Sequence, residues 1–320
     1  MTGKGSLDRY TNDVTQNIFR LSVSEIVYPT SCATFSTTES LTTNCVFDYD
    51  DAAVTYDSKN NVRNLRLTVA YDGTDYAGWQ VQPGRTTVQG ALASAIGRLS
   101  GENVLPQGSG RTDAGVHALA QEVSFATGSP IPVENWMRAL NDILPMSIRV
   151  LNVVDVELDF HARKTARAKT YRYRILRSAN CPPFLARYVW HFPYPLDEAA
   201  MIETASVFVG EHDFTSFAAV DPERVQRMAS EANLLDDNPT TNVRTIYSSV
   251  WARDGEELVY TVRGNGFLHH MVRNLVGTFV LVGKGTVRTE DLQRILSAQE
   301  RSAAGPTAPA CGLYLVGVEY

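Results

Sequence analysis

The sequence predicts an α+β fold in which a largely antiparallel central sheet is flanked by helices. Apolar residues recur with strand-like alternation in some segments and with helical spacing in others, and most neighbouring segments are joined by hairpin-length links. The segments do not follow the regular strand–helix–strand order that indicates a parallel sheet. With 44% hydrophobic and 20% charged residues, the chain of 320 residues can bury a sizeable core.

The first half of this pattern begins at Leu65. Residues 65–71 alternate between apolar and polar side chains, which predicts a half-buried strand. Thr86 or Thr87 can cap the following helix, and Gly101 can end it. The remaining elements expected here are a glycine-rich loop, a strand, a helix opened by a proline and a further strand, at residues 108–115, 121–126, 132–144 and 148–154.

A second set of elements follows, with a boundary expected near Arg167. Asp197 can cap a helix that runs to Val209, and a long helix is expected over 267–282. The other expected elements are strands at 170–176, 244–251, 257–263 and 313–320 and a short helix at 289–298. The chain is therefore interpreted as an extension at 1–63 followed by two halves, at 64–167 and 168–320.

The extension at 1–63 has a different composition from the rest of the chain. Seventeen of its residues are Ser or Thr, eight are acidic, and no stretch keeps a regular apolar period. It lacks the apolar core of a secretory signal, and its acidic residues argue against an organelle transit peptide. We expect a disordered or weakly ordered segment, with a misassigned start codon as the alternative.

Composition and charge exclude several broad classes of protein. A membrane helix needs about 20 consecutive apolar residues, and no such run is present. The four cysteines form no CxxC pair, which argues against a disulfide scaffold or a zinc finger and indicates a cytoplasmic protein. The net charge is −6, but residues 163–177 hold seven basic residues and no acidic one. Because nucleic-acid binding needs a basic stripe rather than a basic protein, this stretch is compatible with an RNA partner.

The strongest local motif is the glycine-rich segment at 108–118. Its glycines allow positive φ angles and the close approach of another chain. Arg111 beside Asp113 would keep the carboxyl ionised, and an ionised aspartate on an exposed loop can act as a nucleophile or as a base. The alternative is an ordinary turn with a local ion pair. The segment lacks the GxxxxGK[ST] pattern of a P-loop.

Residues 162–177 combine aromatic and basic side chains. On a strand, Tyr171 and Tyr173 share one face, while Arg172 and Arg174 share the other. Aromatic faces that stack bases, beside cations that hold phosphates, are what recognition of single-stranded RNA needs. The spacing fits equally well an ordinary strand with its tyrosines in the core and its arginines in solvent.

The segment at 264–274 contains two adjacent histidines and an arginine. On a helix, His269 and Arg273 share a face, and Arg273 is interpreted as a cation presented near the helix start, or else as a solvated surface residue. Adjacent histidines on a helix cannot both face one metal ion, so the sequence predicts no metal site.

Six segments, in order along the chain, resemble the TruA family of tRNA pseudouridine synthases. The resemblance spans residues 65–320, whereas the extension and an acidic segment at 220–242 depart from the family pattern. The segments are YDGT and GWQ within 71–80, GRTDAGVHA at 110–118, KTYRY at 169–173, GEHDFTSF at 210–217, the helical segment at 267–277, and GLYLV at 312–316.

The resemblance implies a fold, an activity and partners. The fold is two related α+β halves around a central sheet, usually in a homodimer. The activity is the conversion of uridine to pseudouridine in the anticodon stem-loop of tRNA, at about positions 38–40, where the target base must be extruded from its stack. No cofactor and no metal are implied.

The resemblance also implies roles for individual residues. By the motif match, Asp113 is the nucleophile, and Arg273 is the cation that pairs with it. Tyr171 contacts the target base, and Leu313 packs near that base from the last segment. Arg111 lies in the loop that manages the RNA and the flipped base.

Two other functions compete with this interpretation. A catalytically silent RNA-binding protein on the same scaffold would tolerate loss of the carboxylate at Asp113, which is present here together with its arginines. An aspartate-dependent nucleosidase or glycosidase would need a second placed carboxylate and would release a free base. Asp72, Asp75 and Asp142 are candidates for that second carboxylate, but none lies in a comparable motif.

Overall fold

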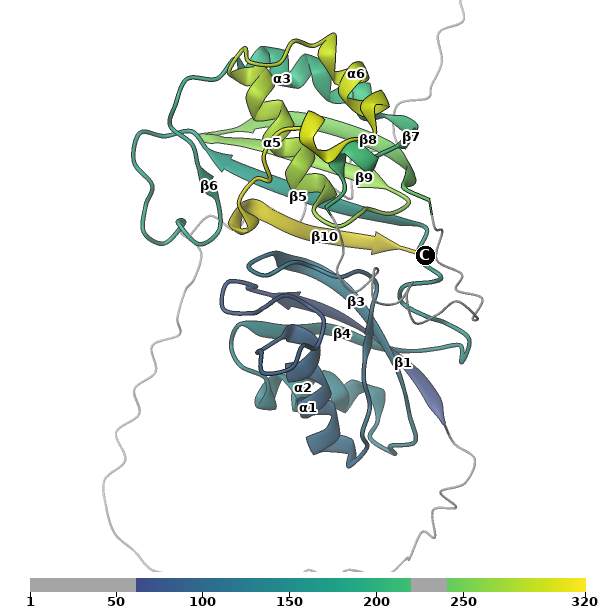
Figure 1. Cartoon of the computed structure of the whole chain (residues 1–320). Helices are drawn as coiled ribbons and strands as arrows, with labels where there is room; N and C mark the ends of the chain where they lie inside the picture. Colours follow the sequence, from purple (N-terminus) through teal and green to yellow (C-terminus); the bar gives the residue numbers. More distant parts are fainter. Residues whose placement is uncertain (1–61, 220–240) are drawn as a thin grey trace, which may run out of the picture. The chain divides into compact units, whose positions relative to one another are not determined.

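The structure is a computed structural model, and it describes residues 62–219 and 241–320 (Figure 1). Within these residues the strands are β1 (Arg63–Tyr71), β2 (Gln107–Gly108), β3 (His117–Thr127), β4 (Ile148–Val156), β5 (Ala168–Leu176), β6 (Trp190–His191), β7 (Gly210–Asp213), β8 (Val243–Asp254), β9 (Glu257–Gly264) and β10 (Leu313–Glu319). The α-helices are α1 (Val88–Ser100), α2 (Val133–Ile143), α3 (Glu198–Thr204), α5 (Met271–Gly283) and α6 (Asp291–Ala298).

The described strands form a single ten-stranded sheet. Eight of them follow the order β4-β1-β3-β10-β5-β9-β8-β7, while β2 pairs with β3 and β6 with β5. In the row of eight, every pair is antiparallel except β3 with β10, which is parallel. The predicted α+β class with a largely antiparallel sheet is therefore confirmed. The parallel pair joins strands of the first half of the sequence to the last strand of the chain.

The helices gather in two groups along this sheet (Figure 1). Helix α1 contacts α2, and α2 packs against β4 in the first half of the sequence. Helix α3 contacts both α5 and β8, and α5 presents a largely apolar sequence to the core. The loop between β2 and β3, the middle of β5, the start of α5 and the start of β10 belong to different parts of the chain. The sheet order brings them to one region beside the β3–β10 junction.

Several helix ends lie where the sequence predicts them. The side chain of Thr87 accepts a hydrogen bond from the amide of Gly90 and caps α1, and Gly101 ends the helix in the left-handed conformation with φ 74°. The Asp197 side chain accepts a hydrogen bond from the Ala200 amide at the start of α3. These caps are local interactions, which is why the sequence predicts them well.

Other element boundaries differ from expectation. Helix α5 begins at Met271 and not at Phe267, because His270 adopts the left-handed conformation with φ 60° and interrupts the helix there. The helix capped by Asp197 ends as an α-helix at Thr204 and continues as a tighter 3₁₀ turn over Ala205–Phe208. The short strands β2, β6 and β7 were not predicted, since two to four residues are too few to show a period.

The divisions expected along the chain are tested only in part. The first strand starts at Arg63, two residues before the expected start of order. The rest of the extension, and residues 220–240 of the acidic segment, lie outside the described residues. The boundary near Arg167 and the relation between the two halves stay predictions.

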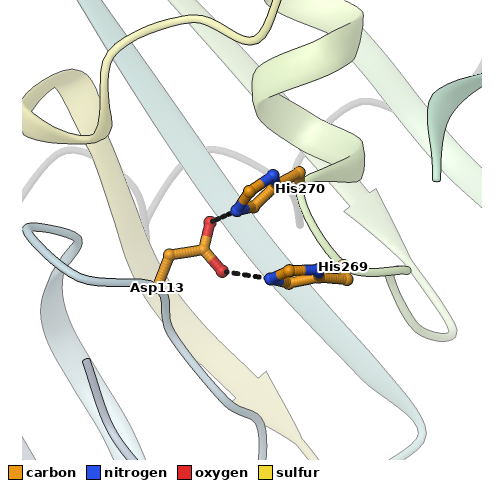
Figure 2. A group of neighbouring side chains, drawn as sticks. All are labelled: Asp113, His269 and His270. Atoms are coloured by element: carbon orange, nitrogen blue, oxygen red, sulfur yellow. Dashed lines mark ion pairs between the residues drawn. The ribbon is translucent and has the colours of Figure 1, made fainter. Parts of the chain in front are cut away.

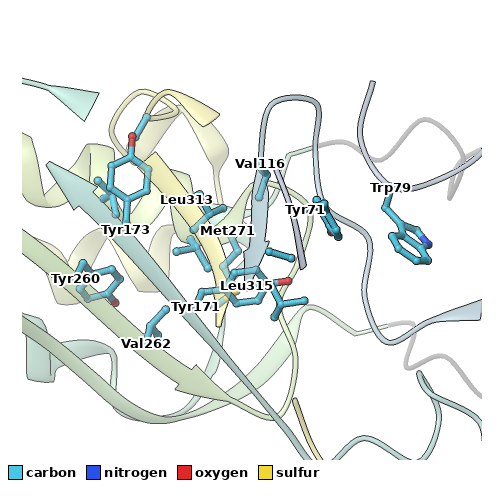
Figure 3. Packing of buried hydrophobic residues seen from close by; sticks show 14 of the residues in the cluster. Tyr71, Trp79, Val116, Tyr171, Tyr173, Tyr260, Val262, Met271, Leu313 and Leu315 are labelled. Atoms are coloured by element: carbon cyan, nitrogen blue, oxygen red, sulfur yellow. The ribbon is translucent and has the colours of Figure 1, made fainter. Parts of the chain in front are cut away.

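One hydrophobic core runs through both halves of the described chain (Figure 3). Tyr71 and Trp79 contribute to it from the first half, and Tyr173 and Tyr260 from the second, each no more than 4% exposed. Buried aromatic rings of this size contribute much of the hydrophobic stabilisation. Since the core is continuous, side chains of the two halves hold each other in place at the junction.

Candidate active site

The loop that carries Asp113 is held by residues of an earlier motif. The Tyr71 hydroxyl and the Thr112 hydroxyl share a hydrogen bond of 2.8 Å, and the Trp79 amide donates to the Thr112 carbonyl at 3.0 Å. Gly78 has φ +96°, and a Cβ there would lie 2.6 Å from the Thr112 carbonyl oxygen. Thr112, the neighbour of Asp113, is thus fixed by its side chain and its backbone.

Glycine is required where this loop meets the tryptophan of the core. A Cβ at Gly108 would lie 2.6 Å from two ring carbons of Trp79. After Asp113 the chain turns through Gly115, which has φ +78° and so favours glycine. The close approach that the glycines of this segment allow is therefore used to seat the loop on the core.

Nitrogen atoms of Arg273, His269 and His270 lie next to the Asp113 carboxylate, and Figure 2 shows the two histidines. Arg273 Nη1 donates a hydrogen bond of 2.8 Å to Oδ2 of the aspartate. Nε2 of His269 lies 3.6 Å from Oδ1, and Nε2 of His270 lies 3.4 Å from Oδ2. The aspartate side chain is 20% exposed, so the carboxylate remains open to an incoming substrate.

Arg273 reaches Asp113 in a fixed orientation. Its Nε donates to the Ala308 carbonyl at 2.7 Å while Nη1 holds the carboxylate. The guanidinium thus uses two sides of its planar fork, and it is only 15% exposed. Its positive charge compensates the partly buried carboxylate across a short, charge-assisted hydrogen bond.

Sequence reasoning missed the contribution of the two histidines. It placed them inside a helix, where adjacent side chains point in different directions. In the structure they precede α5, and the left-handed backbone of His270 turns both rings to the same carboxylate. The rings contact each other, with centroids 4.0 Å apart. The motif contained no signal for that backbone conformation, because histidine is an uncommon residue in the left-handed region.

The imidazole of His270 has an altered titration. Burial lowers its pKa most strongly, the nearby charge of Asp113 raises it, and the positive charges of His269, Arg273 and Arg301 lower it further. The net direction is downward from the usual value for histidine. His270 is therefore neutral at pH 7, so its imidazole adds no positive charge beside Oδ2 of Asp113, which Arg273 pairs.

Asp113, His269 and His270 also supply the donor atoms that a metal ion could use. One atom from each lies within 4.8 Å of the others. However, the guanidinium of Arg273 already bonds the same carboxylate at 2.8 Å, and its fixed positive charge opposes a divalent cation. We interpret the cluster as a carboxylate held for chemistry of its own.

Tyr171 lies on β5 with its ring against the site. The ring is 7% exposed and meets Phe267 edge to face, with centroids 5.0 Å apart. Burial, followed by electrostatic interactions with Tyr71 and with the charge of Asp113, raises the pKa of the Tyr171 hydroxyl, which therefore stays protonated at neutral pH. The predicted facing is confirmed, since Tyr171 and Tyr173 are buried while the arginines between and after them are partly exposed.

The other two predicted site residues, Arg111 and Leu313, come from the glycine-rich loop and from the start of β10. Arg111 is exposed on the loop, two residues before Asp113. Leu313 is 5% exposed and begins β10, opposite Tyr173, while Leu315 lies opposite Tyr171. The sheet register therefore brings the start of β10 beside the strand that carries Tyr171.

Comparison with known proteins identifies the family. A family described as tRNA pseudouridine synthase matches residues 67–163 and 204–320, which is more than half of the chain. The chain belongs to the tRNA pseudouridine synthase family. The tRNA pseudouridine synthase A of Solibacter usitatus is 49% identical over 259 residues, covering 81% of this chain and 100% of that protein. The synthase A of Halalkalibacterium halodurans is 45% identical, covering 79% of this chain and 90% of that protein.

Two further findings complete the comparison. A crystal structure of a Cbf5-Nop10-Gar1 complex matches 67% of this chain and 53% of that chain at 11% identity, with a TM-score of 0.28, which is too low to bear on the fold. Among the described residues of this family member, no helix is long and apolar enough to cross a membrane.

Proposed function

We propose that this chain converts uridine to pseudouridine in the anticodon stem-loop of tRNA, at about positions 38–40, with Asp113 as the nucleophile. One observation carries the proposal. A single carboxylate on a glycine-rich loop is held by Arg273 and faced by two imidazoles, in a chain of the tRNA pseudouridine synthase family. Tyr171 lies beside the same loop, since a Cβ at Gly110 would lie 3.7 Å from its hydroxyl oxygen.

The reaction is an isomerisation, so it consumes no oxidant, reductant or cofactor. The bond between N1 of the base and C1′ of the ribose breaks, and a bond between C5 and C1′ forms. The proton on C5 leaves, and N1 gains one. Asp113 can serve by attacking C1′, by attacking C6 of the base, or by removing the C2′ proton. Each route begins with one ionised carboxylate placed against an extruded nucleotide.

The proposed roles of the other residues follow from where they lie. Tyr171 contacts the extruded base, and together with the neighbouring ring of Phe267 it excludes water, which limits loss of the free base. Arg273 orients Asp113 and compensates its charge. Leu313 packs near the base from the start of β10, and Arg111 contacts RNA from the exposed loop.

Recognition of the tRNA is assigned to the basic stretch at 163–177. Three exposed basic residues of this stretch bind phosphates of the tRNA: Arg163, Lys164 and Arg167. Phosphate contacts supply affinity without reading the sequence. On the precedent of the family the chain works as a homodimer in the cytoplasm, so one subunit can grip a tRNA that the other modifies.

The test is to map pseudouridine in unmodified tRNA transcripts after treatment with the protein. We expect product in the 3′ side of the anticodon stem-loop and none with Asp113→Ala. Release of free uracil would show a nucleosidase, and tRNA binding by the wild-type protein without any product would show a silent binder. Light scattering at micromolar concentration tests the homodimer, which a purely monomeric mass contradicts.

A further inference from the structure

Lys169 turns its ammonium away from solvent and toward the nucleophile loop. It is the second residue of β5 and pairs with Gly264 of β9 on one side and Val318 of β10 on the other. Its Nζ donates a hydrogen bond of 2.6 Å to the carbonyl oxygen of Ser109. Lys169 lies within the basic stretch at 163–177, but its ammonium is bonded to the protein's own backbone.

Ser109 is the point at which the loop is anchored. Its amide donates to the Glu122 carbonyl at 2.7 Å, and its hydroxyl donates to Oε1 of Gln121 at 2.5 Å. Gln121 in turn donates from Nε2 to the Gly110 carbonyl at 2.7 Å. Ser109 and Gln121 are both fully buried. These bonds all join residues of the first half of the sequence. Lys169 adds a hydrogen bond to Ser109 from β5, in the second half.

The loop and the strand meet closely at this point. A Cβ at Gly110 would lie 3.5 Å from Nζ of Lys169 and 3.7 Å from the hydroxyl oxygen of Tyr171. Lys169 and Tyr171 are two residues apart on one strand, so their side chains share a face. The lysine therefore spans the gap between the loop that carries Asp113 and the strand that carries Tyr171.

Burying the positive charge of Lys169 at this position costs free energy. Burial, followed by the positive charges of Arg163 and Arg244, lowers the pKa of Lys169 to about 8. The hydrogen-bond partner that the structure shows for the ammonium is a neutral carbonyl and not a carboxylate. Fold stability alone does not favour a partly buried cation beside two others, and such local conflicts concentrate at functional sites.

We propose that Lys169 is a positioning residue, whose bond to the Ser109 carbonyl sets the separation between Asp113 and Tyr171. The inference rests on the proposed function, since that separation matters only if the two residues act on one nucleotide. A misplacement of about 1 Å can cost roughly 100-fold in rate. Lys169 acts through the loop and is not assigned a contact with the reacting atoms.

A pH dependence follows from the same contact. A neutral amine still donates to the carbonyl, but the bond loses its charge assistance and weakens. We therefore expect the rate on bound tRNA to fall as the pH rises through about 8, where Lys169 loses its proton. The neighbouring hydroxyl of Tyr171 does not titrate in that range, because burial raises its pKa far above it.

The experiment compares Lys169→Met and Lys169→Arg with the wild-type protein in single-turnover assays at saturating protein, from about pH 6.5 to 9.5. We expect Lys169→Met to lower the rate by roughly 10- to 100-fold, with the tRNA dissociation constant within about threefold of wild type. Lys169→Arg should restore most of the rate and abolish the fall above pH 8, because arginine does not titrate there.

Controls separate this proposal from its alternatives. Lys284→Met makes the same substitution at an exposed residue just after α5 and should leave the rate unchanged. A wild-type rate in Lys169→Met, or a loss confined to tRNA affinity and its salt dependence, would overturn the positioning role. If Lys169→Met does not fold, Lys169→Arg provides the test. A rate of Lys169→Arg that still falls above pH 8, as in the wild-type protein, would also contradict the positioning role. A wild-type protein that makes no pseudouridine would instead refute the proposed function.

Discussion

At the scale of single residues, the site depends on how Asp113 is held. The sequence predicted a cation for it, and by family resemblance that cation is Arg273, which the structure places 2.8 Å away. It did not predict His269 and His270 there, since their approach depends on a left-handed backbone at φ 60° that residue spacing does not show. Lys169 lies in the basic stretch, and its ammonium donates a hydrogen bond inward to the Ser109 carbonyl.

Because the planar guanidinium of Arg273 makes two hydrogen bonds at once, we expect that lysine cannot replace it. The guanidinium bonds the Ala308 carbonyl and Asp113 at once, whereas a lysine offers a single point charge on a flexible stem. We expect Arg273→Lys to lower the single-turnover rate by about 10- to 100-fold while tRNA affinity stays near wild type. Rate and affinity are measured on the same transcripts, and an unimpaired rate would show that charge alone is sufficient.

At the scale of elements, the sequence predicted long periodic segments and missed short or non-local ones. Helix α1 lies between the caps expected for it, because capping is a contact between near neighbours. The start of α5 was placed four residues early, since the apolar pattern continues through Phe267 and Leu268 although the helix does not. Strand β7 has four residues and is recognised only by its pairing with β8.

Replacing Gly277 with alanine is expected to change the free energy of unfolding in an unusual direction. In a helix interior, Gly→Ala normally stabilises by about 1 kcal/mol. Here a Cβ would lie 1.7 Å from the backbone carbonyl oxygen of Pro306, which no side-chain rearrangement can relieve. We expect Gly277→Ala to lower the free energy of unfolding by about 3 kcal/mol or more, measured by urea denaturation. Gly317→Ala is the control, because a Cβ there meets nothing within 4 Å.

At the scale of the whole molecule, the site exists because β10, the last strand, lies between β3 and β5. That insertion brings the loop of Asp113 from the first half to the strand of Tyr171 and the helix of Arg273 in the second. The predicted fold class was correct, but the strand order was not predictable, because it depends on pairing between strands about 200 residues apart in sequence.

The N-terminal segment is expected to be dispensable for activity. The family match begins at residue 67, and the Solibacter usitatus relative is matched over 100% of its length by 81% of this chain. A chain that begins at Asn61 keeps all of β1 and should fold and modify tRNA at close to the full rate. The comparison is specific activity at equal concentration of folded protein, and a large loss would show that the segment contributes to the core or to RNA binding.

The basic stretch predicts the salt dependence of tRNA binding. Arg163 and Arg167 are both exposed, so replacing them with alanine should remove phosphate contacts without disturbing the core. We expect weaker binding, with the slope of log affinity against log salt reduced by roughly 0.7 to 0.9 for each lost contact. Binding is titrated at several salt concentrations, and an unchanged slope would place these arginines away from the RNA.

The most direct test of the central claim, that Asp113 is the nucleophile, is the single-turnover rate of pseudouridine formation by its variants. We predict that Asp113→Ala and Asp113→Asn form no product, while both stay folded and bind tRNA with nearly wild-type affinity, because phosphate contacts dominate binding. Asp113→Glu should also fail, since its longer arm displaces the carboxylate by about 1 Å. Pseudouridine formed by Asp113→Ala, free of wild-type contamination, would contradict the account.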